Sequence, residues 1–211
     1  MTIEHLSFIE KTRLREYELE IFFEKSLDCL KMELQRLRNT IYNYNQHEYL
    51  FALNERAWVG AFNNAVIRAF PDNATTLQEF GVYNKHSFIG RADFLVNWKT
   101  PAGKTLYLLF EAKQYEEVSK SEMLNDSSLY LNTVREQGQK YFEAETDYYL
   151  DKTVFIVPLV FGWIRQTGNL SIAKSYFENE NKKDKSTDFC YLYYEGEFGA
   201  WVYGNVHRAK K

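Results

Sequence analysis

The chain has 211 residues, of which 45% are hydrophobic and 26% charged, and it can bury a sizeable core without a disulfide or metal staple. The net charge of −3 counts against a protein that coats nucleic acid, although it is compatible with one local basic groove. The two cysteines, Cys29 and Cys190, form no CxxC pair, so we expect free thiols in a reducing compartment and no zinc or iron–sulfur site.

Nothing in the sequence is typical of export or membrane insertion. The N-terminal residues carry many charges instead of the apolar centre of a signal peptide. The longest apolar stretch, residues 153–164, is too short to span a bilayer and contains Pro158. We therefore expect a cytoplasmic protein with no membrane partner.

The first third of the chain is predicted to be helical. From about Ser7 to Phe70 it contains no proline, and no glycine before Gly60. One or two amphipathic helices are expected up to about Tyr44, and another over residues 46–69. The clearest apolar stripe has alternating steps of four and three residues, and consists of Phe23, Leu27, Leu30, Leu34, Leu37 and Ile41.

These helices divide the chain into an N-terminal helical extension, residues 1–45, and a main domain, residues 46–211. The apolar stripe of the extension could pack on the main domain, form a homodimer, or bind another partner. The sequence leaves these three possibilities open.

Strand patterns begin after this helical part, and the expected fold class is α/β. The order is a helix, a three-stranded antiparallel meander, a helix and a strand, forming a mixed central sheet flanked by helices, with a C-terminal β-hairpin. The expected segments are strands at 77–84, 88–98 and 106–115, a helix over about 121–149, a strand at 152–164 and an aromatic hairpin at 189–206.

Two acidic residues interrupt strands that are otherwise apolar on both faces, as central strands covered by two layers are. Asp93 lies in the second strand of the meander and Glu111 in the third. Because side chains alternate between faces, Asp93 is expected on the face of Leu95, and Ala92 on the face of Phe94. Both carboxylates are thus expected beside a core, where an unpaired charge is costly.

The turn between these strands predicts how they pair. If Thr100–Lys104 form the loop, Lys99 pairs with Thr105, and the same register places Asp93 directly opposite Glu111. Like charges at opposed positions are destabilising. A divalent cation would compensate for them, and a set of oxygen ligands suits Mg²⁺ or Mn²⁺.

Lys113 follows Glu111 one pleat further along and could hold or deprotonate a water at the edge of such a metal. Each feature also has a simpler interpretation. A Glu-x-Lys pair on a strand is usually a surface pair, and Asp93 could cap a loop at the end of its strand. A slip of one residue in the register would turn one carboxylate to the other face.

The segments GRADF (Gly90–Phe94) and EAK (Glu111–Lys113), with the hairpin between them, resemble the active-site motifs of the PD-(D/E)XK nuclease superfamily. QGQKY (Gln137–Tyr141) is similar to the Q-x-x-x-Y motif of the RecB-like and phage-exonuclease branch. The resemblance covers about residues 46–165 and implies a restriction-endonuclease-like core. The chain departs from the pattern in lacking the proline of the superfamily's name, and the absence of a cysteine quartet excludes the iron–sulfur subgroup.

The resemblance implies a metal-dependent nuclease that hydrolyses phosphodiester bonds, most often in DNA, in repair, restriction or phage defence. One or two Mg²⁺ (or Mn²⁺) ions are its cofactor, and endonucleases of this class often act as dimers. The metal ligands it implies are Asp93, Glu111, the backbone carbonyl of Ala112 and, from the first core helix, Glu55.

The resemblance also implies residues that position the attacking water and bind the substrate. Lys113 would orient the attacking water, Gln137 would position the water or a phosphate, and Tyr141 would pack or contact the nucleic-acid backbone. Gln139 replaces Gln137 if the helix is rotated. Glu55 has the alternative of a charge in the first turn of a helix, favoured by the helix dipole. Basic residues that could attract substrate are Arg91, Lys85, Lys99, Lys104, Lys140, Arg56 and Arg68.

Two other functions are compatible with the sequence. The first is a catalytically silent module that keeps the nuclease fold and binds nucleic acid or a protein partner. The second is an unrelated α/β interaction protein in which the charges are coincidental.

Overall fold

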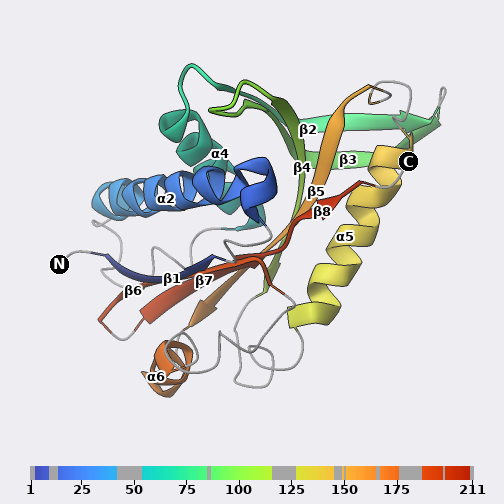
Figure 1. Ribbon diagram of the computed structural model, residues 1–211. Helices are drawn as coiled ribbons and strands as arrows, with labels where there is room; N and C mark the ends of the chain where they lie inside the picture. The colour runs from blue at the N-terminus through green and yellow to red at the C-terminus, as the bar shows by residue number, and fades with distance from the viewer. Residues whose placement is uncertain are drawn as a thin grey trace.

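The computed structural model forms one eight-stranded mixed sheet with helices on both faces (Figure 1). It describes residues 3–9, 14–41, 54–84, 87–115, 127–144, 149, 151–164, 167–175, 187–196 and 198–209. The elements in chain order are β1 (Glu4–Ile9), η1 (Arg15–Tyr17), α2 (Leu19–Ile41), α4 (Glu55–Ala69), β2 (Ala74–Asn84), β3 (Ser87–Lys99), β4 (Thr105–Tyr115), α5 (Ser127–Ala144), β5 (Thr153–Ile164), α6 (Thr167–Ser175), β6 (Phe189–Glu195), β7 (Phe198–Gly204) and β8 (His207–Arg208).

The strand order across the sheet is β1-β6-β7-β5-β4-β3-β2, with β8 also paired to β5. The pair β4 and β5 is parallel, and α5 connects these two strands along the chain. The other pairs are antiparallel. The expected α/β class and the order of helix, antiparallel meander, helix and strand are confirmed, as is the C-terminal hairpin of β6 and β7.

α4 packs on the sheet through aromatic side chains. Trp58 stacks on Phe161 of β5, with ring centroids 5.2 Å apart. Phe62 lies 5.6 Å from Phe110 of β4, and Phe110 stacks on Phe94 of β3 at 4.2 Å. These contacts fix the start of α4 near the C-terminal part of β4. α5 covers the opposite face of the sheet (Figure 1).

α2 lies on the same face as α4, and its apolar stripe is buried within the chain's own core. An ion pair of 2.7 Å between Glu33 and Arg68 joins α2 to α4, and one of 2.7 Å between Arg38 and Glu195 joins α2 to β6. The stripe therefore packs on the main domain, and a homodimer through α2 would have to use other residues. The buried members of the stripe are Phe23, Leu27, Leu30 and Leu34.

The N-terminus differs from the sequence prediction. Residues 4–9 form an edge strand that pairs with β6, so the helix expected from about Ser7 is wrong there. The segment alternates polar and apolar residues, and Leu6 and Phe8 pack against the core. This period of two favours a strand, but its partner lies at the far end of the chain. α6 and β8 were also not expected, and the helix expected over 121–149 is described at 127–144.

Two smaller expectations concern the cysteines and the membrane. Neither Cys29 nor Cys190 forms a disulfide; Cys190 is buried and Cys29 is half-buried. Within the described ranges, no helix has the length and apolar character that crossing a membrane requires.

Candidate active site

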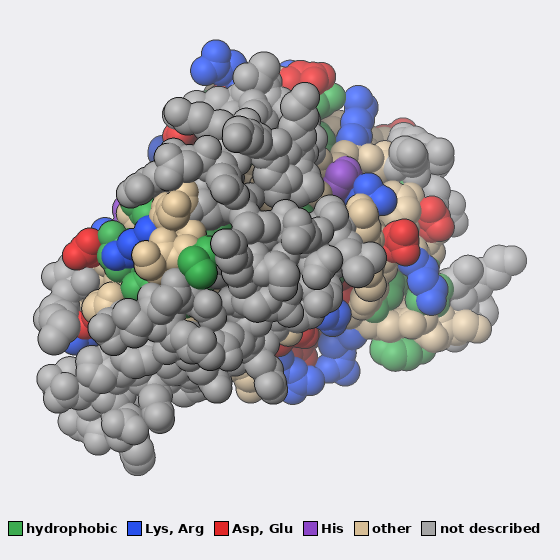
Figure 2. Space-filling model, turned by 90° about the horizontal axis from the view of Figure 1, so that it is seen from below, with side chains coloured by type: hydrophobic (Ala, Val, Ile, Leu, Met, Phe, Trp, Pro, Cys, Tyr) green, Lys and Arg blue, Asp and Glu red, His purple; other side chains and the backbone are tan. Residues whose placement is uncertain are grey.

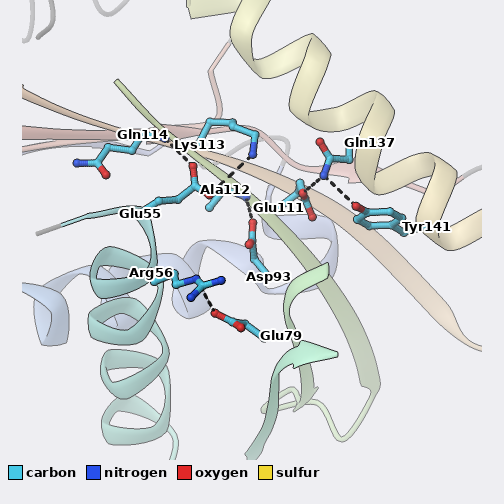
Figure 3. Close-up of polar contacts among 10 residues, drawn as sticks. All are labelled: Glu55, Arg56, Glu79, Asp93, Glu111, Ala112, Lys113, Gln114, Gln137 and Tyr141. Atoms are coloured by element: carbon cyan, nitrogen blue, oxygen red, sulfur yellow. Dashed lines mark hydrogen bonds and ion pairs between the residues drawn. The ribbon is translucent and has the colours of Figure 1, made fainter. Parts of the chain in front are cut away.

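The register predicted from the turn is confirmed. β3 and β4 pair from Lys99 opposite Thr105 as far as Phe94. One position beyond Phe94, the same register would join Asp93 to Glu111, but the described pairing of the two strands ends before it. The two acidic residues therefore lie where β3 and β4 separate (Figure 3).

Asp93 marks a break in the regular geometry of β3. Ala92 packs with Leu95 in the core between the sheet and α5 (the α5-side core). Phe94 packs in the core between the sheet and α4 (the α4-side core). The alternation of faces predicted for these residues is therefore wrong at Asp93. Opposite it on β2, Glu79 has a left-handed backbone (φ 44°), and the ladder between β2 and β3 skips this position. Such backbone outliers are found at functional sites.

The carboxylate of Asp93 accepts a backbone N–H of β4 beyond the point where β3 and β4 stop pairing. Its Oδ2 accepts the N–H of Ala112 at 2.6 Å. Burial raises the pKa of Asp93 to about 6; the hydrogen bond from Ala112 opposes this rise, and the negative charge of Glu55 adds to it. Asp93 is thus held in place but is poorly compensated as an anion.

Glu111 is almost completely buried, at 1% exposed, and points toward α5 (Figure 3). Its Oε1 accepts a hydrogen bond from the side-chain amide of Gln137, and its Oε2 is buried and has no hydrogen-bond partner among the residues that the structure describes. Burial is the main cause that raises the pKa of Glu111 to about 9, and the negative charge of Asp93 is the second. The two carboxyl groups are therefore close enough to interact, and the chain alone leaves Glu111 protonated at neutral pH.

Glu55 and Lys113 form the side of the site that faces α4. Asn54 caps the helix by accepting the N–H of Ala57 at 2.9 Å, so α4 begins at Glu55. Glu55 Oε2 accepts the backbone N–H of Gln114 at 3.2 Å, and Oε1 lies 3.8 Å from Lys113 Nζ. Glu55 is thus a charge in the first turn of α4, as one alternative from the sequence expected, and it also contacts Lys113.

The helix α5 brings Gln137 and not Gln139 to the site. The Nε2 of Gln137 donates to Glu111 and, at 3.0 Å, to the hydroxyl of Tyr141. Gln139 binds Glu143 at 3.0 Å along the exposed surface of the helix. Tyr141 is buried in the α5-side core, which agrees with the packing alternative, and its contact with nucleic acid remains a prediction.

Two glycines allow α5 to lie close to the sheet at this point. A Cβ on Gly138 would be 2.6 Å from Cγ2 of Ile156, and a Cβ on Gly90 would be 2.5 Å from the hydroxyl of Tyr141. Both distances are shorter than any normal contact. The close approach is what lets Gln137 reach a carboxylate on β4. A glycine inside a helical pattern, as in QGQKY, is the sequence signal for such an approach.

The acidic pair fits a divalent cation in its chemistry, but the set of ligands is small. Among the described residues, no group of three or more His, Cys, Asp or Glu side chains is placed to hold a metal ion. Asp93 and Glu111 offer hard oxygen donors, and their pKa values stay raised despite the positive charge of Lys113. Among the described residues, Oε2 of Glu111 has no hydrogen-bond partner. Ligation by Glu55 and by the carbonyl of Ala112 remains a prediction.

The basic residues around the site are mixed with acidic ones. Arg91 and Arg56 are exposed, and both pair with Glu79, at 3.2 and 3.3 Å. Arg68 pairs with Glu33 of α2 instead. Lys85 lies outside the described residues. On the face seen in Figure 2, the described basic side chains (blue) and acidic side chains (red) are interspersed, which agrees with the small net charge of −3.

Glu79 is the residue of this site that sequence reasoning missed. It pairs with both arginines, and its charge contributes to the raised pKa of Asp93. The register of β2 and β3 shifts between Val82 and Tyr83, so counting back from their turn does not place Glu79 opposite Asp93.

No match to this chain is found among protein-family models, curated proteins or solved structures. The resemblance to PD-(D/E)XK nucleases therefore depends on the residues of the chain itself. The functional argument that follows uses the same residues and their geometry.

Proposed function

We propose that the chain is a metal-dependent nuclease of the PD-(D/E)XK type, which hydrolyses phosphodiester bonds, with DNA as the expected substrate. The proposal depends above all on one observation: Asp93, Glu111 and Lys113 come together where β3 and β4 separate. The order of α4, the meander of β2 to β4, α5 and β5 supports a restriction-endonuclease-like core.

The acidic pair would hold the metal, and its raised pKa values have a consequence for binding. A bound Mg²⁺ or Mn²⁺ ion supplies an activated water and neutralises charge on the phosphate. Glu111 would release its proton on binding the ion, because a carboxylate ligand must be deprotonated. Metal affinity should therefore increase with pH.

The surrounding residues would orient the reacting groups. Lys113 is 3.8 Å from Glu55, and its charge lowers the pKa of both Asp93 and Glu111. With its positive charge beside these carboxyl groups, Lys113 would stabilise negative charge on the phosphate. The amide of Gln137 would hold Oε1 of Glu111 in a fixed position.

The test is cleavage of plasmid and single-stranded DNA by the purified protein with Mg²⁺ or Mn²⁺. Asp93→Asn and Lys113→Met should each reduce the cleavage rate by about 100-fold or more, as loss of one charge-stabilising group does. Asp72→Asn, at an exposed position between α4 and β2, is the matched control and should cleave normally. Activity that survives both site variants would refute the proposed site.

The second candidate is a catalytically silent module with the nuclease fold that binds nucleic acid or a protein. It is favoured by the lack of a group of three metal-binding side chains within the described residues. Calorimetric titration with Mn²⁺ separates the two functions. Binding that is lost in Asp93→Asn supports the nuclease, whereas no binding at millimolar metal supports the silent module.

A further inference from the structure

The outer part of the β2–β3 hairpin extends beyond the rest of the sheet. Within the described strand pairs, residues 87–93 of β3 have no partner in β4, and within this range Ser87, Phe88 and Gly90–Ala92 pair with β2. Figure 1 shows this hairpin extending past the upper end of α5. Near its end, Tyr83 lies opposite Phe88, and their rings meet edge to face with centroids 5.5 Å apart.

These two aromatic side chains are unusually exposed for this chain. Tyr83 is 50% exposed and Phe88 is 59% exposed. The other large apolar side chains that are exposed in the described residues, Met32, Ile67 and Leu77, are aliphatic and lie elsewhere. Single exposed apolar residues are ordinary, but two aromatic rings in contact at the end of a hairpin form a surface. Packing of the core does not account for this surface, because at least half of the surface of each residue is exposed.

The hairpin connects this aromatic pair directly to the candidate active site. Phe88 lies five residues before Asp93 on the same strand, which is about 17 Å along an extended chain. The phosphates of one strand are about 3.4 Å apart along a DNA double helix, so this length corresponds to at most about five nucleotides. Arg91, which is exposed, lies between the pair and the site. A strand of nucleic acid along the hairpin would thus meet a cation first and the aromatic rings beyond it.

We infer that Tyr83 and Phe88 bind an unpaired nucleobase of the nucleic acid whose phosphate lies at Asp93 and Glu111. This inference rests on the proposed function and adds a substrate class, namely nucleic acid with a single-stranded segment beside the cleaved bond. An edge-to-face pair leaves the faces of one ring free of the other ring, and an unpaired base stacks on such a face. The positive charge of Arg91 complements the phosphates of the same strand.

The test is binding of a fluorescent single-stranded oligonucleotide and of the duplex of the same sequence, by anisotropy in the presence of EDTA. Phe88→Ala should weaken single-strand binding by about ten-fold, as loss of one stacked base contact does, and should change duplex binding less than two-fold. Tyr83→Ala should act in the same direction. Leu77→Ala, at a residue of the same strand β2 that is 53% exposed, is the matched control and should bind normally.

Two further variants separate stacking from simple apolar contact. Phe88→Trp should keep single-strand binding, and Phe88→Leu, which keeps apolar area without an aromatic face, should lose it. Full binding by Phe88→Leu would overturn the inference, as would equal losses on single strand and duplex. A change of oligomeric state in Phe88→Ala, measured by light scattering, would assign the pair to an interface between copies of the chain and would also overturn it.

The two proposals fail in different ways. If the wild-type protein binds single strands through Tyr83 and Phe88 but does not cleave with metal, the aromatic site stands and the nuclease is refuted. If the protein cleaves but the Phe88→Ala variant binds single strands normally, the nuclease stands and the aromatic site is refuted.

Discussion

The two halves of β3 differ in their strand partners and in their burial. The inner half, Phe94–Lys99, pairs with β2 and β4 and contributes side chains to the cores on both faces. The outer half, Ser87–Asp93, pairs within the described strands with β2 alone, as far as Ala92, and most of its side chains are exposed or half-buried. Phe94 is 0% exposed, whereas Phe88 is 59% exposed. One strand therefore serves as core and as exposed surface, and it changes from one to the other at Asp93.

The position of this change explains how a carboxylate can lie beside the core. Within the paired half, the N–H of Ala112 would have a backbone partner on β3. Because the pairing ends at Phe94, this N–H is donated to Asp93 instead. The separation of the strands thus creates both the space for acidic side chains and a donor to hold one of them.

The largest expected effect tests the contrast between the two halves directly. Phe94→Ala should reduce the free energy of unfolding by about 3–5 kcal/mol, because the ring is buried and stacks on Phe110 at 4.2 Å. Phe88→Ala should change it by less than about 0.5 kcal/mol, since its ring is mostly in water. Urea unfolding of both variants gives the comparison. Similar losses for the two would show that the outer half is part of the core.

The second effect concerns Glu111 of β4, which lies near Asp93, where the inner half of β3 meets the outer half. Glu111 has a pKa of about 9 in the folded protein, against an ordinary value of 4.5. Between these values the folded state keeps a proton that the unfolded state has released, so stability should fall as pH rises from about 4.5 to 9. Glu111→Gln removes this dependence and should be more stable than the wild type at pH 9 by about 2 kcal/mol or more.

The measurement is the free energy of unfolding against pH, in the presence of a chelator, for the wild type and for Glu111→Gln. The difference between the two proteins isolates Glu111 from the other titrating groups. It should be small near pH 4.5 and largest near pH 9. A constant difference over this window would contradict the raised pKa.

The strand β3 and the pairing of its inner half could be predicted from the sequence, whereas the faces and the pairing of its outer half could not. The loop after Lys99 fixed the register as far as Phe94, because the turn and the apolar pattern agree there. The break at Asp93 depends on the left-handed Glu79 of β2 and on a register shift beyond Val82, neither of which leaves a periodic pattern. β1 was missed for a similar reason, since its partner is β6 at the other end of the chain.

The parts of the candidate site that a local sequence pattern defines were predictable. Spacing along a helix brought Gln137 and Tyr141 together, and a Glu-x-Lys pattern identified the residues on β4. The hydrogen bond from Ala112 to Asp93 and the choice of Gln137 over Gln139 depend on how α5 and the strands pack, which no local pattern reports.

A third, smaller effect tests how far the outer half depends on α5. A Cβ on Gly90 would be 2.5 Å from the hydroxyl oxygen of Tyr141 and 2.9 Å from its ring, so Gly90→Ala should cost about 1–3 kcal/mol through overpacking. Tyr141→Phe removes the closest of these atoms, so the double variant should lose less than the sum of the two single variants. A double-mutant cycle by urea unfolding measures this coupling. Strict additivity would show that the contact with α5 does not constrain the hairpin.

The smallest expected effect on stability is at Arg91, in the same outer half. Its ion pair with Glu79 is exposed, so Arg91→Ala should change the free energy of unfolding by less than about 0.5 kcal/mol. If Arg91 contacts a phosphate, the same variant should weaken nucleic-acid binding and reduce the slope of log affinity against log salt by about 1. Arg15→Ala, at an exposed residue of η1, is the control and should leave the slope unchanged. An unchanged slope in Arg91→Ala would restrict Arg91 to its surface ion pair and would leave the aromatic pair as the part of the outer half that binds nucleic acid.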